Sequence, residues 1–207
     1  MVNNFVLSDQ FQEIISLFEK SSKNIFITGK AGTGKSSLIR YLKNNTKKNL
    51  VLLAPTAIAA LNINAKTIHS FFNFPFHIIT KSDIKKHYNK RLINKIDTIL
   101  IDEASMLRPD IMDAIDLTLQ ITRENKQPFG GIQMVLVGDL YQLPPVITND
   151  EIEIMSSLYP DGCFFFNSLI CEILLTKLLK EKIMNIIKKT IFSVLASLLI
   201  VGNVHAD

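Results

Sequence analysis

The chain has 207 residues, which is enough for one α/β domain with at most a small appendage. Its net charge of +4 permits a nucleic-acid partner without requiring one. Two cysteines, Cys163 and Cys171, and four scattered histidines exclude a disulfide framework and a zinc-ligand set.

Residues 8–20 predict an amphipathic helix near the start of the chain. Four apolar residues recur at helical spacing in this stretch: Phe11, Ile14, Ile15 and Phe18. One face of the helix is therefore expected to pack against the rest of the domain.

The stretch 29–36, Gly-Lys-Ala-Gly-Thr-Gly-Lys-Ser, matches the phosphate-binding pattern G-x-x-x-x-G-K-[ST]. It lies between an apolar run at 24–28, which predicts a buried strand, and residues 36–42, which have helical spacing. Glycines let backbone N–H groups surround a polyphosphate, and the next helix presents its positive N-terminal end. The alternative is a glycine-rich turn without a ligand. The predicted nucleotide-binding residues of the loop are Gly29, Lys30, Ala31, Gly32, Thr33, Gly34, Lys35, Ser36 and Ser37.

Two side chains of this loop have predicted roles of their own. Lys35 is expected to reach the β- and γ-phosphates, and the Ser36 hydroxyl is expected to hold Mg²⁺. The loop indicates a nucleoside triphosphate but does not identify the reaction.

The apolar run 49–55 predicts a second strand, one that is covered on both faces in a parallel sheet. Residues 81–95 follow as a charged stretch with six lysines and arginines. Such a stretch is usually a solvated face, and a nucleic-acid contact is the alternative.

Residues 98–103 predict a third strand that ends in two carboxylates, Asp102 and Glu103. An acidic residue at the carboxyl end of a parallel strand lies beside the phosphate loop of such sheets. Asp102 is expected to hold Mg²⁺ through water, and Glu103 to orient and deprotonate an attacking water. An isolated Asp-Glu pair is a weak signal, but its position after a phosphate loop makes it a strong one.

Residues 106–123 predict a helix, and residues 133–139 predict a fourth strand. The strand ends in a polar loop that is stopped by Pro144 and Pro145. Gln142, within this loop, is expected to sense the γ-phosphate through its side-chain amide; an ordinary strand-to-loop turn is the alternative. These elements together predict an α/β fold with a parallel sheet and helices on both faces.

The order of these segments resembles the PIF (petite integration frequency) helicases, a RecD-related family in superfamily one. Ala104 departs mildly from the isoleucine that is usual there, and Ala57 from the usual glycine. The segments that carry the resemblance are 29–36, 54–63, 67–71, 101–106, 103–123 and 138–146.

The resemblance implies a RecA-like P-loop domain that uses ATP and Mg²⁺ to move 5′ to 3′ on single-stranded DNA, in repair, recombination or genome maintenance. It implies catalytic roles for Lys35, Glu103 and Gln142, and it implies that Gln12 reads adenine, with Gln10 as the alternative. The residues implied to contact DNA are Pro55, Thr56, His69, Ser70 and Phe71, with Phe71 stacking on a base.

The resemblance weakens after residue 175. Residues 174–180 stand where the family continues with an arginine-glutamine motif and then a second RecA-like domain. We therefore expect residues 1–183 to form the first motor domain, which binds ATP and turns it over slowly. The alternatives are an inactive remnant that binds ATP and DNA without unwinding, or another phosphate-loop ATPase.

Residues 184–207 resemble a secretory signal peptide at the wrong end of a protein. A short basic segment precedes an apolar run at 190–202, which is shorter than the ~20 residues that a membrane span needs. A buried or amphipathic helix is the alternative, and any membrane association is expected only through this tail. The start of the chain lacks a secretory signature, which predicts a cytoplasmic location.

Overall fold

The computed structural model describes residues 9–174, and the predicted tail lies outside them. Within these residues, five parallel strands form one sheet in the order β1-β5-β4-β2-β3. Their bounds are Ile25–Thr28 for β1, Leu50–Ala54 for β2, Lys66–Thr67 for β3, Thr98–Ile101 for β4 and Gln133–Gly138 for β5. The predicted parallel sheet is therefore confirmed, with a two-residue strand added at the β2 edge.

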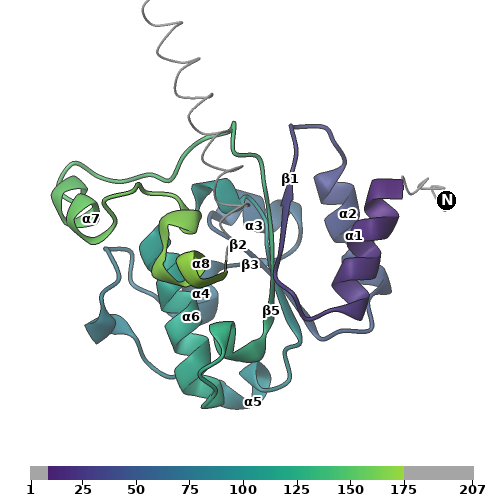
Figure 1. Ribbon diagram of the computed structural model, residues 1–207, viewed down its shortest axis with the longest axis horizontal. Helices are drawn as coiled ribbons and strands as arrows, with labels where there is room; N and C mark the ends of the chain where they lie inside the picture. The colour runs from purple at the N-terminus through teal and green to yellow at the C-terminus, as the bar shows by residue number, and fades with distance from the viewer. Residues whose placement is uncertain (1–8, 175–207) are drawn as a thin grey trace, which may run out of the picture.

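Helices cover both faces of this sheet, as Figure 1 shows, with α1 and α2 on one side and α4, α6 and α8 on the other. The helices are α1 Asp9–Lys20, α2 Lys35–Asn45, α3 Ala57–Asn62, α4 Ile68–Phe72, α5 Lys90–Ile93, α6 Pro109–Arg123, α7 Ile152–Leu158 and α8 Leu169–Leu174. In the described part of the chain, 3₁₀ turns lie at Lys81–Asp83, Ala104–Met106, Pro128–Gly131 and Phe165–Asn167.

The two faces explain why the strands are continuously apolar in sequence. Leu100 and Val135 join the core under α1 and α2, whereas Ile99 and Met134 join the core under α6. Because successive side chains of a strand point to opposite faces, both sets must be apolar when both faces are covered.

The helix predicted at 106–123 begins later, at Pro109. Arg108 has extended backbone angles, φ −74° and ψ 152°. Proline disfavours the helical region for the residue before it and fits the first helical turn itself. The segment from Ala104 to Met106 instead forms a separate 3₁₀ turn, which turns the chain away from β4.

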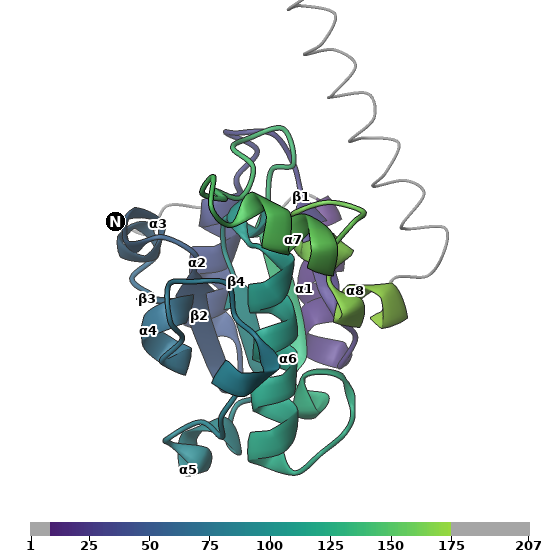
Figure 2. The ribbon, with the colours of Figure 1, turned by 90° about the vertical axis from the view of Figure 1, so that its left-hand side faces the viewer.

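The charged stretch 81–95 lies mostly at the surface, as a solvated face would. Lys86 and Lys90 both contact Glu124, and each of these side chains is about half exposed or more. In Figure 2, α5 of this stretch lies at the end of the sheet opposite α3 and α7.

The turn between α6 and β5 depends on one buried carboxylate. Phe129 and Gly130 have left-handed backbone angles, with φ of 54° and 62°. Asp116 is 5% exposed, and its Oδ1 accepts a hydrogen bond from the Phe129 N–H while Oδ2 accepts one from Gln120. The carboxylate therefore holds a phenylalanine in a conformation that side chains rarely adopt.

Replacing Asp116 with alanine is expected to destabilise the domain by about 1–3 kcal/mol, because the buried Phe129 N–H loses its acceptor. Denaturant unfolding followed by circular dichroism measures the change. Asp161→Ala, at an exposed position, serves as the control and is expected to leave stability within ~0.5 kcal/mol of wild type. Equal stability of the two variants would contradict the role of Asp116.

Candidate functional site

The predicted phosphate loop joins β1 to α2 and encloses its own lysine. The Lys35 ammonium donates hydrogen bonds to the carbonyl oxygens of Gly29 and Lys30, the latter at 3.0 Å. Gly34 has φ +88°, and a Cβ atom there would lie 3.1 Å from the ring of Phe11. The loop therefore encloses the Lys35 ammonium next to the N-terminal end of α2. Both the positive charge and the helix end favour the binding of an anion at this loop.

Asp102 and Glu103 follow β4 at the same edge of the sheet. Asp102 is 7% exposed, and its Oδ1 accepts a hydrogen bond of 3.0 Å from the Glu103 N–H. Burial raises the pKa of Asp102, while the backbone hydrogen bond and the Lys35 charge lower it. Glu103 itself has left-handed angles, φ 52° and ψ 40°. Such an outlier in a residue with a side chain is typical of functional sites.

The pKa of Glu103 is raised, first by burial and then by the negative charge of Asp102. The Lys35 charge lowers it and the Asp139 charge raises it. All three charged neighbours therefore act on the pKa of Glu103. A carboxyl group with a raised pKa is a better proton acceptor, because its pKa lies closer to neutral pH.

The end of β5 packs closely on the turn that follows Glu103. A Cβ atom on Gly138 would lie 3.0 Å from the Ser105 nitrogen and 3.1 Å from the Ala104 nitrogen. Only glycine lets the two backbones approach this closely. As Figure 1 shows, the loops after β1 and β5 leave the sheet at the same edge.

Asp139 is a member of this site that the sequence analysis missed. It is 4% exposed, its Oδ1 accepts from the Tyr141 N–H at 3.1 Å, and its carbonyl accepts from the Gln142 N–H at 3.0 Å. The signal was available, since Asp139 follows a parallel strand just as Asp102 does.

A hollow of about 670 Å³ opens beside Glu103. It brings together three residues that were predicted separately, Thr56, Glu103 and Gln142. The remaining lining residues are Ile58, Ala59, Asn62, Met106, Tyr141, Leu143 and Pro144. The predicted catalytic and DNA-contacting segments therefore share one surface.

The predicted DNA-contacting residues differ in how accessible they are. Thr56 begins α3, and its hydroxyl accepts from the Ala59 N–H at 3.2 Å. Pro55 is half-buried next to it, and Ser70 is exposed on α4. His69 is half-buried and stacks on Phe76 with ring centroids 5.0 Å apart. Burial and the Arg108 charge lower the pKa of His69, which keeps the ring neutral at pH 7.

The predicted base stacking by Phe71 is wrong for this structure. Phe71 is 4% exposed, and its ring packs against Phe72 and His87 in the core. Adjacent Phe71 and Phe72 are both apolar, so the sequence alone did not tell which faces inward; both do.

Gln12, predicted to read adenine, is exposed on α1. The neighbouring Phe11 lies against Gly34 of the phosphate loop, so α1 borders this loop. This position is compatible with a contact to the base of a nucleotide, and the role of Gln12 stays a prediction.

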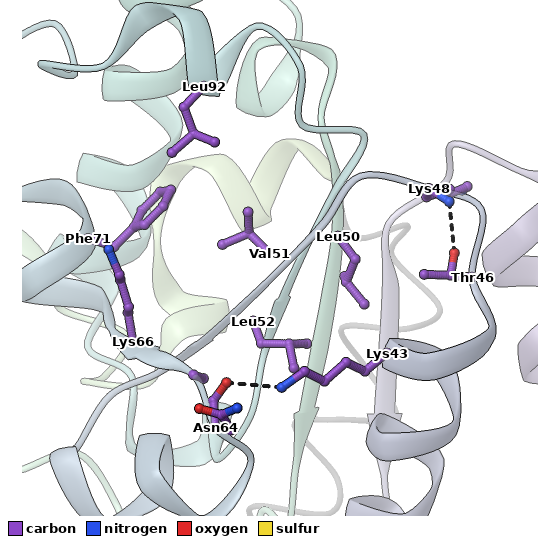
Figure 3. Close-up of a pocket in the computed structure, with 11 residues that line it drawn as sticks. Lys43, Thr46, Lys48, Leu50, Val51, Leu52, Asn64, Lys66, Phe71 and Leu92 are labelled. Carbon is purple, nitrogen blue, oxygen red and sulfur yellow. Dashed lines mark hydrogen bonds between the residues drawn. The ribbon is translucent and has the colours of Figure 1, made fainter.

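A second hollow, of about 520 Å³, lies along β2 and is drawn in Figure 3. Its lining includes Lys43, Leu50 and Leu92 but neither carboxylate of the candidate site. The Lys43 ammonium donates to the carbonyls of Ile63 and Asn64, at 3.3 and 3.1 Å. This lysine therefore joins α2 to the segment after α3. Because the hollow along β2 lacks the predicted carboxylates, we place the candidate site at Glu103 instead.

Within residues 9–174, no group of three or more histidine, cysteine, aspartate or glutamate side chains could hold a metal ion. No helix in that part of the chain is long and apolar enough to cross a membrane.

The chain matches the sequence profile described as PIF1-like helicase over residues 7–201, past the boundary predicted at residue 183. It is 40% identical over 153 residues to the ATP-dependent DNA helicase PIF1 of Saccharomyces cerevisiae, covering 68% of this chain and 17% of that protein. The ATP-dependent DNA helicase RRM3 of Saccharomyces cerevisiae is 32% identical, covering 86% of this chain and 26% of RRM3.

The Pif1 helicase from Bacteroides, solved in complex with ADP-AlF3 and ssDNA, superposes with a TM-score of 0.75 at 44% identity. That match covers 81% of this chain and 40% of the solved chain. The chain thus spans less than half the length of the relatives it matches.

Replacing Glu103 with glutamine is expected to stabilise the domain at pH 7 and to have no effect near pH ~3.5. In the unfolded chain Glu103 has the ordinary pKa of 4.5, whereas burial raises its pKa in the folded chain. As the pH rises, the unfolded chain therefore loses this proton before the folded chain does. Stability therefore falls as pH rises from the unfolded pKa through the folded pKa, and the penalty is constant above both. A neutral side chain removes that penalty.

Thermal unfolding of both proteins at the two pH values measures this difference. Glu153→Gln on the exposed side of α7 is the control, and its melting temperature should follow wild type at each pH. A Glu103→Gln variant that is less stable than wild type at pH 7 would disprove the expected charge penalty.

Proposed function

Because the chain belongs to the PIF1-like helicase family, we propose that it is the first motor domain of an ATP-dependent DNA helicase. One observation carries this proposal: the phosphate loop, the Asp102–Glu103 pair and the Gln142 loop meet at one edge of the sheet, and Thr56 shares the hollow beside Glu103. Ligands of open α/β sheets bind at this carboxyl edge.

In this proposal the phosphate loop binds the triphosphate of ATP. The backbone N–H groups at the start of α2 and the Lys35 ammonium neutralise phosphate charge. Lys35 already lies inside the loop, so it exchanges two carbonyl contacts for phosphate oxygens without crossing open space. Gln12 on the neighbouring α1 supplies the contact to adenine.

Mg²⁺ fits the residues that are present. It commonly takes one or two protein ligands together with waters and phosphate oxygens, so a cage of carboxylates is not required. The exposed Ser36 hydroxyl and the buried Asp102 carboxylate are the proposed ligands. When bound, the ion supplies neutralisation of the charge on the β- and γ-phosphates.

Glu103 is the proposed general base for hydrolysis. Its carboxylate accepts a proton from the attacking water as that water's oxygen bonds to the γ-phosphorus and the bond to the bridging oxygen breaks. The raised pKa of Glu103 supports this role. Gln142 lies on the same hollow, where its amide would contact the γ-phosphate or the water.

Slow turnover is expected for residues 1–207 by themselves. They cover 40% of the solved Bacteroides helicase, and the family resemblance implies an ATP site that closes against a second domain, with arginines from outside the phosphate-loop domain. Such an arginine contributes about 10³–10⁵ in rate. We therefore propose ATP binding with weak hydrolysis for these residues alone.

Single-stranded DNA is the proposed track of the motor. Ser70 and Thr56 offer hydroxyl groups, and the neutral His69 offers a ring nitrogen, for hydrogen bonds to the DNA backbone. The Bacteroides relative was solved with ssDNA, which supports the same class of ligand here. An ordinary phosphate-loop ATPase is the second candidate, and it would show no change in ATPase activity when DNA is added.

Lys35→Ala is expected to weaken ATP–Mg²⁺ binding by about 10- to 150-fold, the loss that corresponds to a charged hydrogen bond of ~1.5–3 kcal/mol. Isothermal calorimetry measures the affinity. Lys47→Ala, at an exposed position after α2, removes the same charge elsewhere and should bind as wild type does. If Lys35→Ala binds with unchanged affinity, the loop does not hold the triphosphate.

Ser70→Ala is expected to weaken binding of a fluorescent oligothymidine by about 2- to 12-fold, as the loss of one net hydrogen bond implies. Ser156→Ala on the exposed side of α7 is the matched control and should retain wild-type affinity. Fluorescence anisotropy at several salt concentrations measures both, and affinity should fall as salt rises because phosphates release counterions. If Ser70→Ala binds the oligothymidine with wild-type affinity, Ser70 of α4 does not contact the DNA.

A further inference from the structure

Arg108 is a buried cation outside the candidate nucleotide site. Its side chain is 9% exposed, and its guanidinium contacts Asp110, two residues away, and two distant segments at His77 and Glu151. Nε and Nη2 donate to the two oxygens of Asp110, at 3.0 and 2.9 Å. Nη2 also donates to the His77 carbonyl at 3.2 Å, and Nη1 donates to Glu151 Oε1 at 3.3 Å.

One of these segments leads to the nucleotide site. The other oxygen of Glu151 accepts from the N–H and the hydroxyl of Thr148, at 3.1 and 2.9 Å. Between Thr148 and Gln142 lie Pro144 and Pro145, which fix backbone angles and stiffen the connection. Gln142 and Glu151 are therefore joined by a short segment whose backbone freedom is reduced by the two prolines.

The second segment leads to the proposed DNA contact. The Ile79 N–H donates to Asp110 at 2.9 Å, and the His77 carbonyl accepts from Arg108, so the loop 77–79 is held at His77 and at Ile79. Phe76 precedes this loop and stacks on His69 with an interplanar angle of 14°. The position of His69 is thereby linked to the loop that Arg108 holds.

These contacts are costly to break singly. Removing one partner of a buried ion pair leaves a charge without compensation, whereas an exposed pair contributes little. The side chains of Asp110 and Glu151 are 0% and 15% exposed, so the guanidinium has few solvated positions to adopt if either loop moves. Movement of one loop must then change the contacts of the other.

From this arrangement we propose that Arg108 is a positioning residue that couples the loop after β5 to the segment carrying His69. The coupling makes ATP binding change the affinity for single-stranded DNA, and it rests on the proposed function. Arg108 touches neither ligand in this scheme. Its effect is on the free energy that links the two binding events.

The test measures this linkage in the full chain. The dissociation constant of a fluorescent oligothymidine is determined with and without a non-hydrolysable ATP analogue and Mg²⁺. For wild type the two constants should differ by about 5-fold or more, the usual lower range of coupling between sites. Glu151→Gln weakens the Arg108 contact, so the ratio of the two DNA dissociation constants should fall to within about twofold of one. The affinity for DNA alone and the affinity for the ATP analogue alone should each change by a smaller factor than this ratio does.

Two further variants separate coupling from simple stability. Glu153→Gln removes the same charge from an exposed position on α7 and should keep the wild-type ratio. Arg108→Lys keeps a cation but loses the forked geometry that serves three partners, and its ratio should also fall toward one. A loss of stability alone would not change this ratio as long as the molecules measured are folded. Circular dichroism checks that each variant is folded under the conditions of the binding assay.

The outcomes distinguish the two proposals. If wild type binds either ligand weakly or not at all, the proposed function fails and the coupling falls with it. If wild type binds both ligands but Glu151→Gln keeps the wild-type ratio, or wild type shows a ratio of one, the proposed function stands and the role of Arg108 is overturned.

Discussion

The close contact between Gly138 and the turn at Ala104 and Ser105 is the constraint on which the rest of the site depends. It holds the end of β5 against the end of β4, while the pairing of Thr28 with Gly138 holds β1 on the other side. Three loops that are distant in sequence therefore leave the sheet at one edge. A larger residue at 138 would separate them, whatever the chemistry of their side chains.

The same closeness concentrates negative charge around one cation. Glu103 lies within the electrostatic reach of Asp102, Asp139 and Lys35, and burial raises the pKa of both carboxyl groups of the Asp-Glu pair. The left-handed backbone of Glu103 adds strain at the same point. A protein optimised only for stability would avoid buried carboxylates next to a strained backbone. This combination is typical of a functional site, where the chemistry requires groups that destabilise the fold.

Sequence patterns predicted the parts of this domain that depend on neighbouring residues. The phosphate loop follows from its glycine spacing, and the strands follow from apolar runs, because a sheet covered on both faces needs them. Patterns failed where the answer depends on distant contacts. The buried state of Phe71 is set by packing against His87, 16 residues away. The later start of α6 follows instead from a local signal, Pro109, which apolar periodicity does not register. The partners of Arg108 lie up to 43 residues away, so no local periodicity indicates that network.

The place of β5 between β1 and β4 has a consequence for how the chain is made. Asn24 and Met134, which are hydrogen-bonded beside the β1–β5 pair, are 110 residues apart in sequence. At a synthesis rate of ~5–20 residues per second, β1 waits about 5 to 20 seconds for the strand beside which it will lie. During that interval the apolar segment Ile25–Thr28 has no strand partner among the described residues already made, because β2 pairs with β3 and β4. The nascent chain therefore carries its phosphate loop on an unpaired strand edge, which is where chaperones and misassembly compete with folding.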